Sequence, residues 1–175
     1  MPRPRSLALF AVLLAAATGG AGLLPAAEGP ELAPPRRTIA VTVDDLPFVA
    51  HGLPLAAVRT LSHDLVAALA ARKVPAVAFV NEDRLFVPGE VDVRIAILTE
   101  WLDAGMELGN HTWGHPGLTK TPLAEMEDAV VRGETVTRWL LERRGARPRW
   151  FRHPFAQTGT SQGTRDAFEA FLAAR

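Results

Sequence analysis

Short apolar runs alternate along this chain with longer segments of helical periodicity, and this alternation most restricts its fold. The predicted buried strands are residues 38–43, 74–80, 106–109 and 149–151. Helical spacing of apolar residues predicts helices at residues 54–72, 91–104, 121–143 and 164–172. Strands that alternate with helices form a parallel sheet or an α/β barrel. With only four strands before residue 175, we expect the N-terminal portion of a longer α/β fold.

The first 37 residues have the pattern of an export signal followed by a linker. Two arginines precede an unbroken apolar run over residues 7–17, and small residues follow. This order is typical of a secretory signal peptide, and the run is short for a membrane span. We therefore expect a signal peptide at residues 1–27, with an uncleaved anchor as the alternative. A proline-rich linker at residues 28–37 would lead into one domain at residues 38–175.

Composition excludes several kinds of site. The chain has no cysteine, which rules out disulfides, thiolate metal sites and a cysteine nucleophile. Its formal net charge is +0, so it lacks the basic excess that marks nucleic-acid-binding proteins.

Polar side chains follow three of the predicted strands. Asp44 and Asp45 follow the first, His111 and His115 the third, and Arg152 the fourth. Each group alone is also typical of an ordinary turn, but parallel strands end at one face, where the groups can converge. Two histidines and a carboxylate can bind a metal and leave positions open for water and substrate. A second carboxylate can then act as general base, held ionised and oriented by an arginine.

In order and content these motifs resemble those of the polysaccharide deacetylase family, the NodB-homology carbohydrate esterases of family 4. Residues 42–45, TVDD, are similar to the family motif T-F-D-D, and residues 111–115, HTWGH, to H-[ST]-x-x-H. Residues 152–155, RHPF, resemble R-x-P-[FY]. The resemblance covers residues 38–155.

The resemblance implies a distorted (β/α) barrel of the NodB-homology type, here truncated after about four strands. It implies a metal-dependent hydrolase that removes N- or O-acetyl groups from an exported or cell-wall polysaccharide. The partner would be an acetylated polysaccharide or oligosaccharide in the periplasm or outside the cell. We expect no nucleic-acid partner and no stable membrane span after signal cleavage.

The resemblance also implies a role for individual residues. A divalent metal, zinc by default with cobalt or nickel as alternatives, would be bound by Asp45, His111 and His115. Asp44 would be the general base, and Arg152 would orient it. The backbone N–H of Phe155 would help to stabilise the tetrahedral oxyanion.

The chain departs from the family pattern at Leu46, where a glycine is usual, and at His153, where many members have proline. We interpret His153 as a motif variant rather than a catalyst. The family's later motifs, one of which supplies the histidine that protonates the leaving group, have no counterpart here. His51 and His63 match neither motif, and we expect His63 to lie on a helix surface without a partner.

Two other functions therefore remain open. One is hydrolysis of a non-peptide C–N bond in a small amide or cyclic imide. The other is a non-catalytic glycan-binding fragment, because we expect these 175 residues alone to be inactive or nearly so.

Overall fold

A computed structural model describes residues 38–48 and 52–175 of the chain. The expected signal peptide, the expected linker and His51 lie outside these residues. Thr38–Arg175 form one compact unit. No helix in the described part of the chain is long and apolar enough to cross a membrane.

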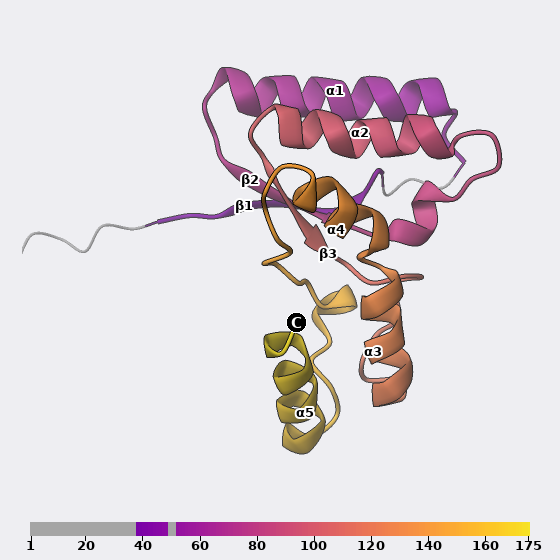
Figure 1. Ribbon diagram of the computed structural model, residues 1–175, viewed down its shortest axis with the longest axis vertical. Helices are drawn as coiled ribbons and strands as arrows, with labels where there is room; N and C mark the ends of the chain where they lie inside the picture. Colours follow the sequence, from indigo (N-terminus) through magenta and orange to yellow (C-terminus); the bar gives the residue numbers. More distant parts are fainter. Residues whose placement is uncertain (1–37, 49–51) are drawn as a thin grey trace, which may run out of the picture. The chain divides into compact units, whose positions relative to one another are not determined.

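The centre of this unit is a parallel sheet of three strands in the order β1-β2-β3 (Figure 1). The strands are β1 (Val41–Leu46), β2 (Ala76–Val80) and β3 (Glu107–Asn110). Ala78 pairs with Val43 on one side and with Leu108 on the other. Because all three strands run the same way, their carboxyl ends meet at one edge of the sheet.

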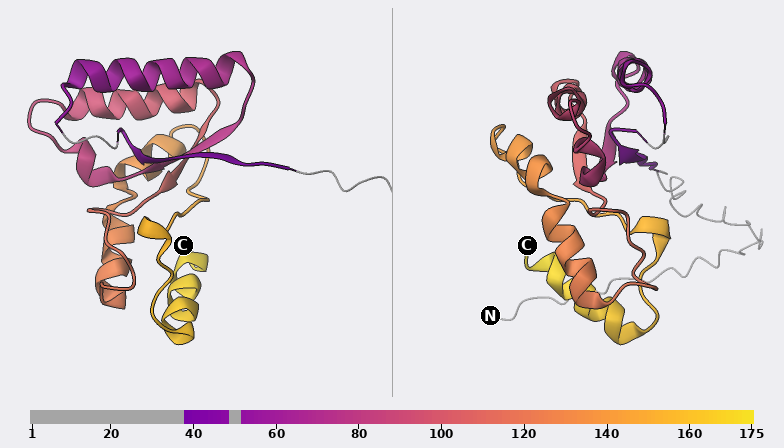
Figure 2. Two further views of the ribbon diagram at one scale, coloured as in Figure 1. Left: turned by 180° about the vertical axis from the view of Figure 1, so that it is seen from behind. Right: turned by 90° about the vertical axis from the view of Figure 1, so that its right-hand side faces the viewer.

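Helices connect and cover the strands. They are α1 (Leu55–Ala71), α2 (Val91–Asp103), α3 (Leu123–Arg132), α4 (Thr135–Glu142) and α5 (Gln162–Ala173). There are also two short 3-10 helices. The first, η1 (Glu82–Leu85), follows β2, and the second, η2 (Pro154–Ala156), precedes α5. Figure 2 shows α1 and α2 side by side, as two connections that return to a parallel sheet require.

Two apolar clusters hold these elements together. In the larger one, Val58 and Val66 of α1 pack with Ala78 of β2 and with Leu98 and Trp101 of α2. The buried indole of Trp101 donates a hydrogen bond to Ser62 Oγ at 3.0 Å, so its only polar atom is paired. The smaller cluster joins α3 to α5 through its buried members Leu118, Met126, Val130 and Phe168.

The prediction of a single helix over residues 121–143 is wrong, because the segment is broken between α3 and α4. At the break, Ala129 O accepts hydrogen bonds from Gly133 N at 3.0 Å and from Trp113 N at 2.8 Å. A Cβ at Gly133 would lie 2.4 Å from the backbone carbon of Thr112. The helix is therefore interrupted where the 111–115 loop lies against it. Pro122 holds the N-cap position of α3, with no side-chain cap bond.

The predicted fourth strand is also wrong as a strand. It is reduced to an isolated parallel bridge between Asn110 and Phe151. Around this bridge Asn110 N donates to Trp150 O at 2.9 Å, and Arg152 N donates to Asn110 O at 3.0 Å. Pro148 has no N–H to extend the pairing on one side, and the chain turns away after Asn110 on the other.

Candidate metal centre and active site

An irregularity in β1 brings both aspartates to the end of the sheet. Val43 pairs with Ala78 but Leu46 pairs with Val80, so β1 holds one more residue than β2 across this step. Asp45 lies within the step at φ 64°. Neighbouring residues of a regular strand point to opposite faces, whereas a bulge can redirect one of them. Here Asp45 Oδ1 lies 3.7 Å from His115 Nε2, and Asp44 Oδ1 lies 3.4 Å from Arg152 Nε.

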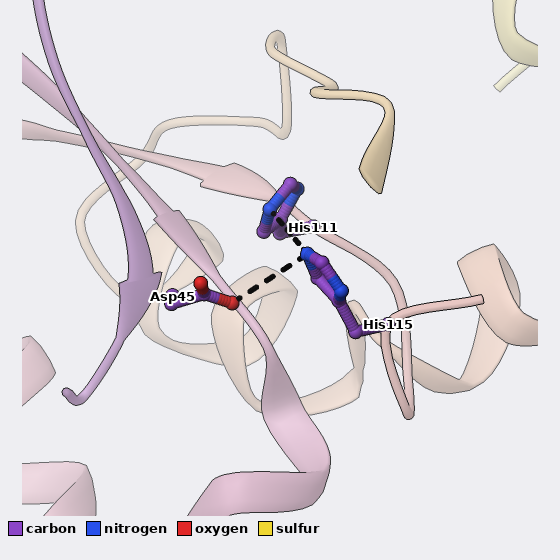
Figure 3. A group of neighbouring side chains, drawn as sticks. All are labelled: Asp45, His111 and His115. Atoms are coloured by element: carbon purple, nitrogen blue, oxygen red, sulfur yellow. Dashed lines mark hydrogen bonds and ion pairs between the residues drawn. The ribbon is translucent and has the colours of Figure 1, made fainter. Parts of the chain in front are cut away.

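Asp45 lies beside both histidines of the 111–115 loop (Figure 3). The ligand atoms of Asp45, His111 and His115 all lie within 4.8 Å of one another. The Nε2 atoms of the two histidines are 3.1 Å apart, and His115 Nε2 lies 3.7 Å from Asp45 Oδ1. The structure thus brings together the three expected metal ligands, which come from the ends of β1 and β3.

The protonation of this group suits a metal. His111 Nδ1 lies 2.9 Å from the carbonyl oxygen of Arg152, which can only accept, so Nδ1 carries the hydrogen and Nε2 faces the site. Burial is the main cause that lowers the pKa of His115; the charges of His111 and Arg84 lower it further, while Asp45 and Asp83 oppose them. A neutral imidazole is the form that binds metal.

Asp45 completes the donor set. Its Oδ1 is buried and, among the described residues, accepts no hydrogen bond. Arg84 Nη2 lies 3.4 Å from this oxygen and balances its charge. A buried oxygen without a hydrogen bond beside two imidazole nitrogens fits a divalent cation.

Asp44 and Arg152 form a second, more exposed pair. Arg152 Nε lies 3.4 Å from Asp44 Oδ1, and the two side chains are 38% and 42% exposed. Arg152 Nη2 also donates to Thr42 Oγ1 at 2.9 Å, and the guanidinium lies 4.7 Å from the ring centroid of Phe79. The arginine is held from three sides, so it can orient a carboxylate that water can still reach.

Phe155 lies beside the histidines. Its ring centroid is 4.5 Å from that of His115, and its side chain is largely exposed. Of the six non-glycine residues at positive φ in the described chain, five lie in or next to the three motifs: Asp45, Thr112, His115, Phe155 and Ala156. Such conformations persist only where the surroundings enforce them, and they cluster at functional sites.

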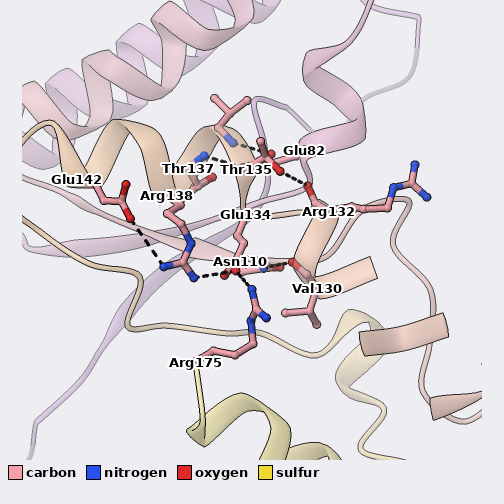
Figure 4. Close-up of polar contacts among 11 residues, drawn as sticks. Glu82, Asn110, Val130, Arg132, Glu134, Thr135, Thr137, Arg138, Glu142 and Arg175 are labelled. Atoms are coloured by element: carbon pink, nitrogen blue, oxygen red, sulfur yellow. Dashed lines mark hydrogen bonds and ion pairs between the residues drawn. The ribbon is translucent and has the colours of Figure 1, made fainter. Parts of the chain in front are cut away.

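The histidine loop is held by buried hydrogen bonds that we did not predict (Figure 4). Asn110 Nδ2 donates to Val130 O at 2.8 Å, and Asn110 Oδ1 accepts from Thr112 N at 2.6 Å. Asn110 thereby ties the end of β3 to α3 and fixes the turn between the two histidines. Its place between an apolar strand and His111 was the available sequence signal.

Glu82 was also missed. Its fully buried carboxylate accepts hydrogen bonds from Thr137 N at 2.6 Å and Val136 N at 3.0 Å, in the first turn of α4 (Figure 4). Burial raises its pKa, and the two backbone N–H groups partly oppose that rise. Glu82 therefore fixes α4, and with it the α3–α4 junction that packs on the histidine loop.

Two further histidines lie in other contacts. His63 Nδ1 is 2.5 Å from Glu100 Oε1 on α2, so our expectation that His63 lacks a partner is wrong. The ring centroid of His153 lies 5.1 Å from that of Phe151 and 5.4 Å from that of Phe168, which belongs to α5. Burial lowers the pKa of His153, and neither histidine belongs to the metal-ligand group.

Sequence comparison adds one finding. The profile of the family described as "Polysaccharide deacetylase" matches residues 31–169. No curated protein matches the chain significantly.

Several solved structures share the fold. A peptidoglycan deacetylase, PdaC, from Bacillus subtilis is 25% identical over 79% of this chain and 58% of its own, with a TM-score of 0.51. A family 4 acetyl xylan esterase from Clostridium thermocellum, in complex with a cobalt ion, is 24% identical over 74% and 53%, with a TM-score of 0.51. A CE4 family pseudoenzyme from Bacillus anthracis is 17% identical over 79% and 42%, with a TM-score of 0.58.

This chain thus spans 42% to 58% of the length of these three structures. The similarity confirms the expected fold class, an α/β fold of the NodB type that is truncated. Within the described residues it has three strands and one bridge rather than four strands.

Proposed function

The chain belongs to the polysaccharide deacetylase family, and we propose that it is a metal-dependent hydrolase of acetyl groups on a polysaccharide. The observation that carries this proposal is the convergence of two groups at one edge of the sheet. Asp45, His111 and His115 have ligand atoms within 4.8 Å of one another. The second group is the ion pair of Asp44 with Arg152, and Asp44 lies at the same end of β1 as Asp45.

Asp45, His111 and His115 would hold the divalent ion, zinc by default and cobalt or nickel as alternatives. When bound, the ion would supply Lewis-acid polarisation of the acetyl carbonyl. The similar acetyl xylan esterase from Clostridium was solved in complex with a cobalt ion, which supports a divalent metal here.

The remaining chemistry belongs to the protein. Asp44 would take the proton of the attacking water, because it directly precedes Asp45 in the chain, its carboxylate is half-exposed and Arg152 holds it in place. The backbone N–H of Phe155 would stabilise negative charge on the former carbonyl oxygen. The packing of Phe155 on His115 supports this assignment, since it places η2 beside the ligands.

Protonation of the leaving group has no evident source in the described chain. His63 is engaged with Glu100, and His153 is packed between Phe151 and Phe168. This observation favours a second candidate, a non-catalytic module that binds glycans. The Bacillus anthracis pseudoenzyme shows that the fold also occurs without catalysis.

An aryl acetate separates the two candidates, because 4-nitrophenolate leaves without protonation. We expect the full chain with zinc to hydrolyse 4-nitrophenyl acetate, and to release little acetate from N-acetylated chito-oligomers. A chelator should abolish ester hydrolysis, and Asp44→Asn should lower its rate about 10²–10⁴-fold. Asp64→Asn, at an exposed position of α1, is the matched control and should leave the rate unchanged. Zinc binding without zinc-dependent ester hydrolysis would favour the non-catalytic module.

We also propose that the substrate lies outside the cytoplasm. The sequence pattern of residues 1–27 supports export. The peptidoglycan deacetylase among the similar structures makes a cell-wall glycan the first substrate to test.

A further inference from the structure

A buried amide at the end of β2 has no role in the site as described so far. Asn81 follows β2 directly and is 1% exposed. Within residues 38–48 and 52–175, neither its Oδ1 nor its Nδ2 has a hydrogen-bond partner. An unpaired buried polar group costs about 1–3 kcal/mol, and nearly all such groups bond to protein or to ordered water.

The backbone places Asn81 between the two strand ends that carry the metal ligands. Asn81 N donates to Leu46 O at 3.1 Å, next to Asp45, and His111 N donates to Val80 O at 2.9 Å. Asn81 therefore occupies the middle position at this edge of the sheet.

The alternation of side chains places its amide on the face of the site. Phe79, two residues earlier, lies under the Arg152 guanidinium, with its ring centroid 6.4 Å from that of His111. Asn81 is still extended, at φ −98° and ψ 94°, so its side chain leaves β2 on the same face as Phe79.

Two neighbouring carboxylates also have an oxygen without a hydrogen bond. Asp45 Oδ1 and Asp83 Oδ1 are both buried without a hydrogen bond in the described chain. Asn110 shows the contrast, because this amide at the end of β3 is 4% exposed and bonded at both ends. Asn110 has a structural role, whereas the amide of Asn81 has no hydrogen-bond partner among residues 38–48 and 52–175.

We infer that Asn81 is a positioning residue of the proposed metal centre and holds Asp45 through a buried water molecule. The inference rests on the proposed function, since it concerns the ligand Asp45. A buried water can accept a hydrogen bond from Asn81 Nδ2 and donate one to Asp45 Oδ1, with its second hydrogen left for another of the oxygens that lack a hydrogen bond. Asp45 Oδ1 has lone pairs for both the water and the cation. A carboxylate held in this way stays directed at His111 and His115.

The test substitutes Asn81 by leucine, which has nearly the same shape and no polar atoms. We expect Asn81→Leu to raise the Kd for Zn²⁺ of the full chain about 10–100-fold in calorimetric titration. In the presence of chelator, its Tm should stay near that of the parent, because the amide makes no hydrogen bond to protein within the described residues. Asn110→Leu is the matched control, and its Tm in chelator should fall, because Val130 O and Thr112 N lose their partner.

Three results would overturn the inference. Unchanged zinc affinity in Asn81→Leu would show that the amide has no part in the metal centre, whatever the Tm. If Asn81→Leu does not fold, Asn81→Ala must show the same loss of affinity, and parental affinity there would refute the role. A parent chain that binds no zinc would refute the proposed metal centre itself, a failure distinct from that of Asn81 alone.

Discussion

Asp44 and Asp45 are neighbours in sequence but differ in environment. The Asp45 side chain is 16% exposed beside Arg84 and His115, whereas Asp44 is 42% exposed and pairs with Arg152. Both lie at the bulged end of β1, where Asp45 is beside a histidine and Asp44 remains accessible to water. This difference is the physical basis for assigning one to the metal and the other to the proton.

The two roles predict different responses to loss of charge. Asp45→Asn should weaken zinc binding at least about tenfold, since it removes an anionic ligand from a three-residue site. Asp44→Asn should leave zinc affinity near that of the parent. Calorimetric titration of both variants measures this difference, and an equal loss of affinity in both would contradict the division of roles.

His153 makes stability depend on pH. Burial against Phe151 and Phe168 lowers its pKa in the folded state. The backbone of Gln157 and the charge of Glu169 oppose this shift, and Arg165 adds to it. As the pH falls through about 6.5, His153 therefore takes up a proton more readily in the unfolded chain than in the folded one. The free energy of unfolding that is present above this pH decreases as the pH falls further.

His153→Phe should remove this dependence, because phenylalanine fits an aromatic contact and does not titrate. We expect the parent to lose more Tm than the variant between pH 7.5 and pH 5.5 in thermal unfolding with chelator. Equal losses of Tm would show that His153 is not the responsible group.

At the scale of elements, sequence patterns predicted the strands and helices whose formation depends on residues close together in the chain. The structure has β2, β3 and the helices α1, α2 and α5 close to the places that β-branched runs and apolar periodicity predict. β1 begins and ends three residues later than the strand predicted at residues 38–43, so Asp44 and Asp45 lie within it rather than after it. The break between α3 and α4 depends on Thr112, and the first turn of α4 is held by Glu82, 54 and 55 residues before its partners. No window of sequence contains such contacts, so the break was missed.

For the candidate site, too, features set by local sequence were predicted and features set by contacts between distant residues were not. Its proposed ligands and base were predicted from motifs near strand ends, whose shared edge follows from parallel topology. The bulge that lets both aspartates reach that edge was not predicted, because its register is set by pairing with β2. The supporting amides of Asn81 and Asn110 were missed for the same reason: their partners, or the lack of them, appear only in three dimensions.

Gly133 is the tightest contact between the helices and the histidine loop. A Cβ there would lie 2.4 Å from Thr112 C and 2.6 Å from Trp113 N, both backbone atoms. Gly133→Ala should therefore destabilise the chain by about 1–3 kcal/mol, measured by denaturant unfolding. Gly163→Ala is the control, because the nearest atom to its Cβ is 3.9 Å away and alanine favours the α5 helix by about 0.5–1 kcal/mol. Equal stability of Gly133→Ala and the parent would show that the loop yields.

On the scale of the whole molecule, the folded unit combines a helix-covered parallel sheet with a smaller cluster that joins α3 and α5. The larger core fixes the ends of β1 and β3, which carry the proposed metal ligands. The smaller core supports Arg152 and Phe155 through the packing of Phe151 against Phe168. The proposed chemistry therefore depends on both cores, although the chain spans 42% to 58% of the similar structures.

Zinc binding by the full chain tests the central claim most directly. Calorimetric titration should give about one Zn²⁺ per folded molecule, as three converging ligands imply. His111→Ala should abolish binding at micromolar zinc, while His63→Ala, at the α1–α2 contact, should bind as the parent does. No zinc binding by the parent, or equal stoichiometry and affinity in His111→Ala, would contradict a metal centre at Asp45, His111 and His115.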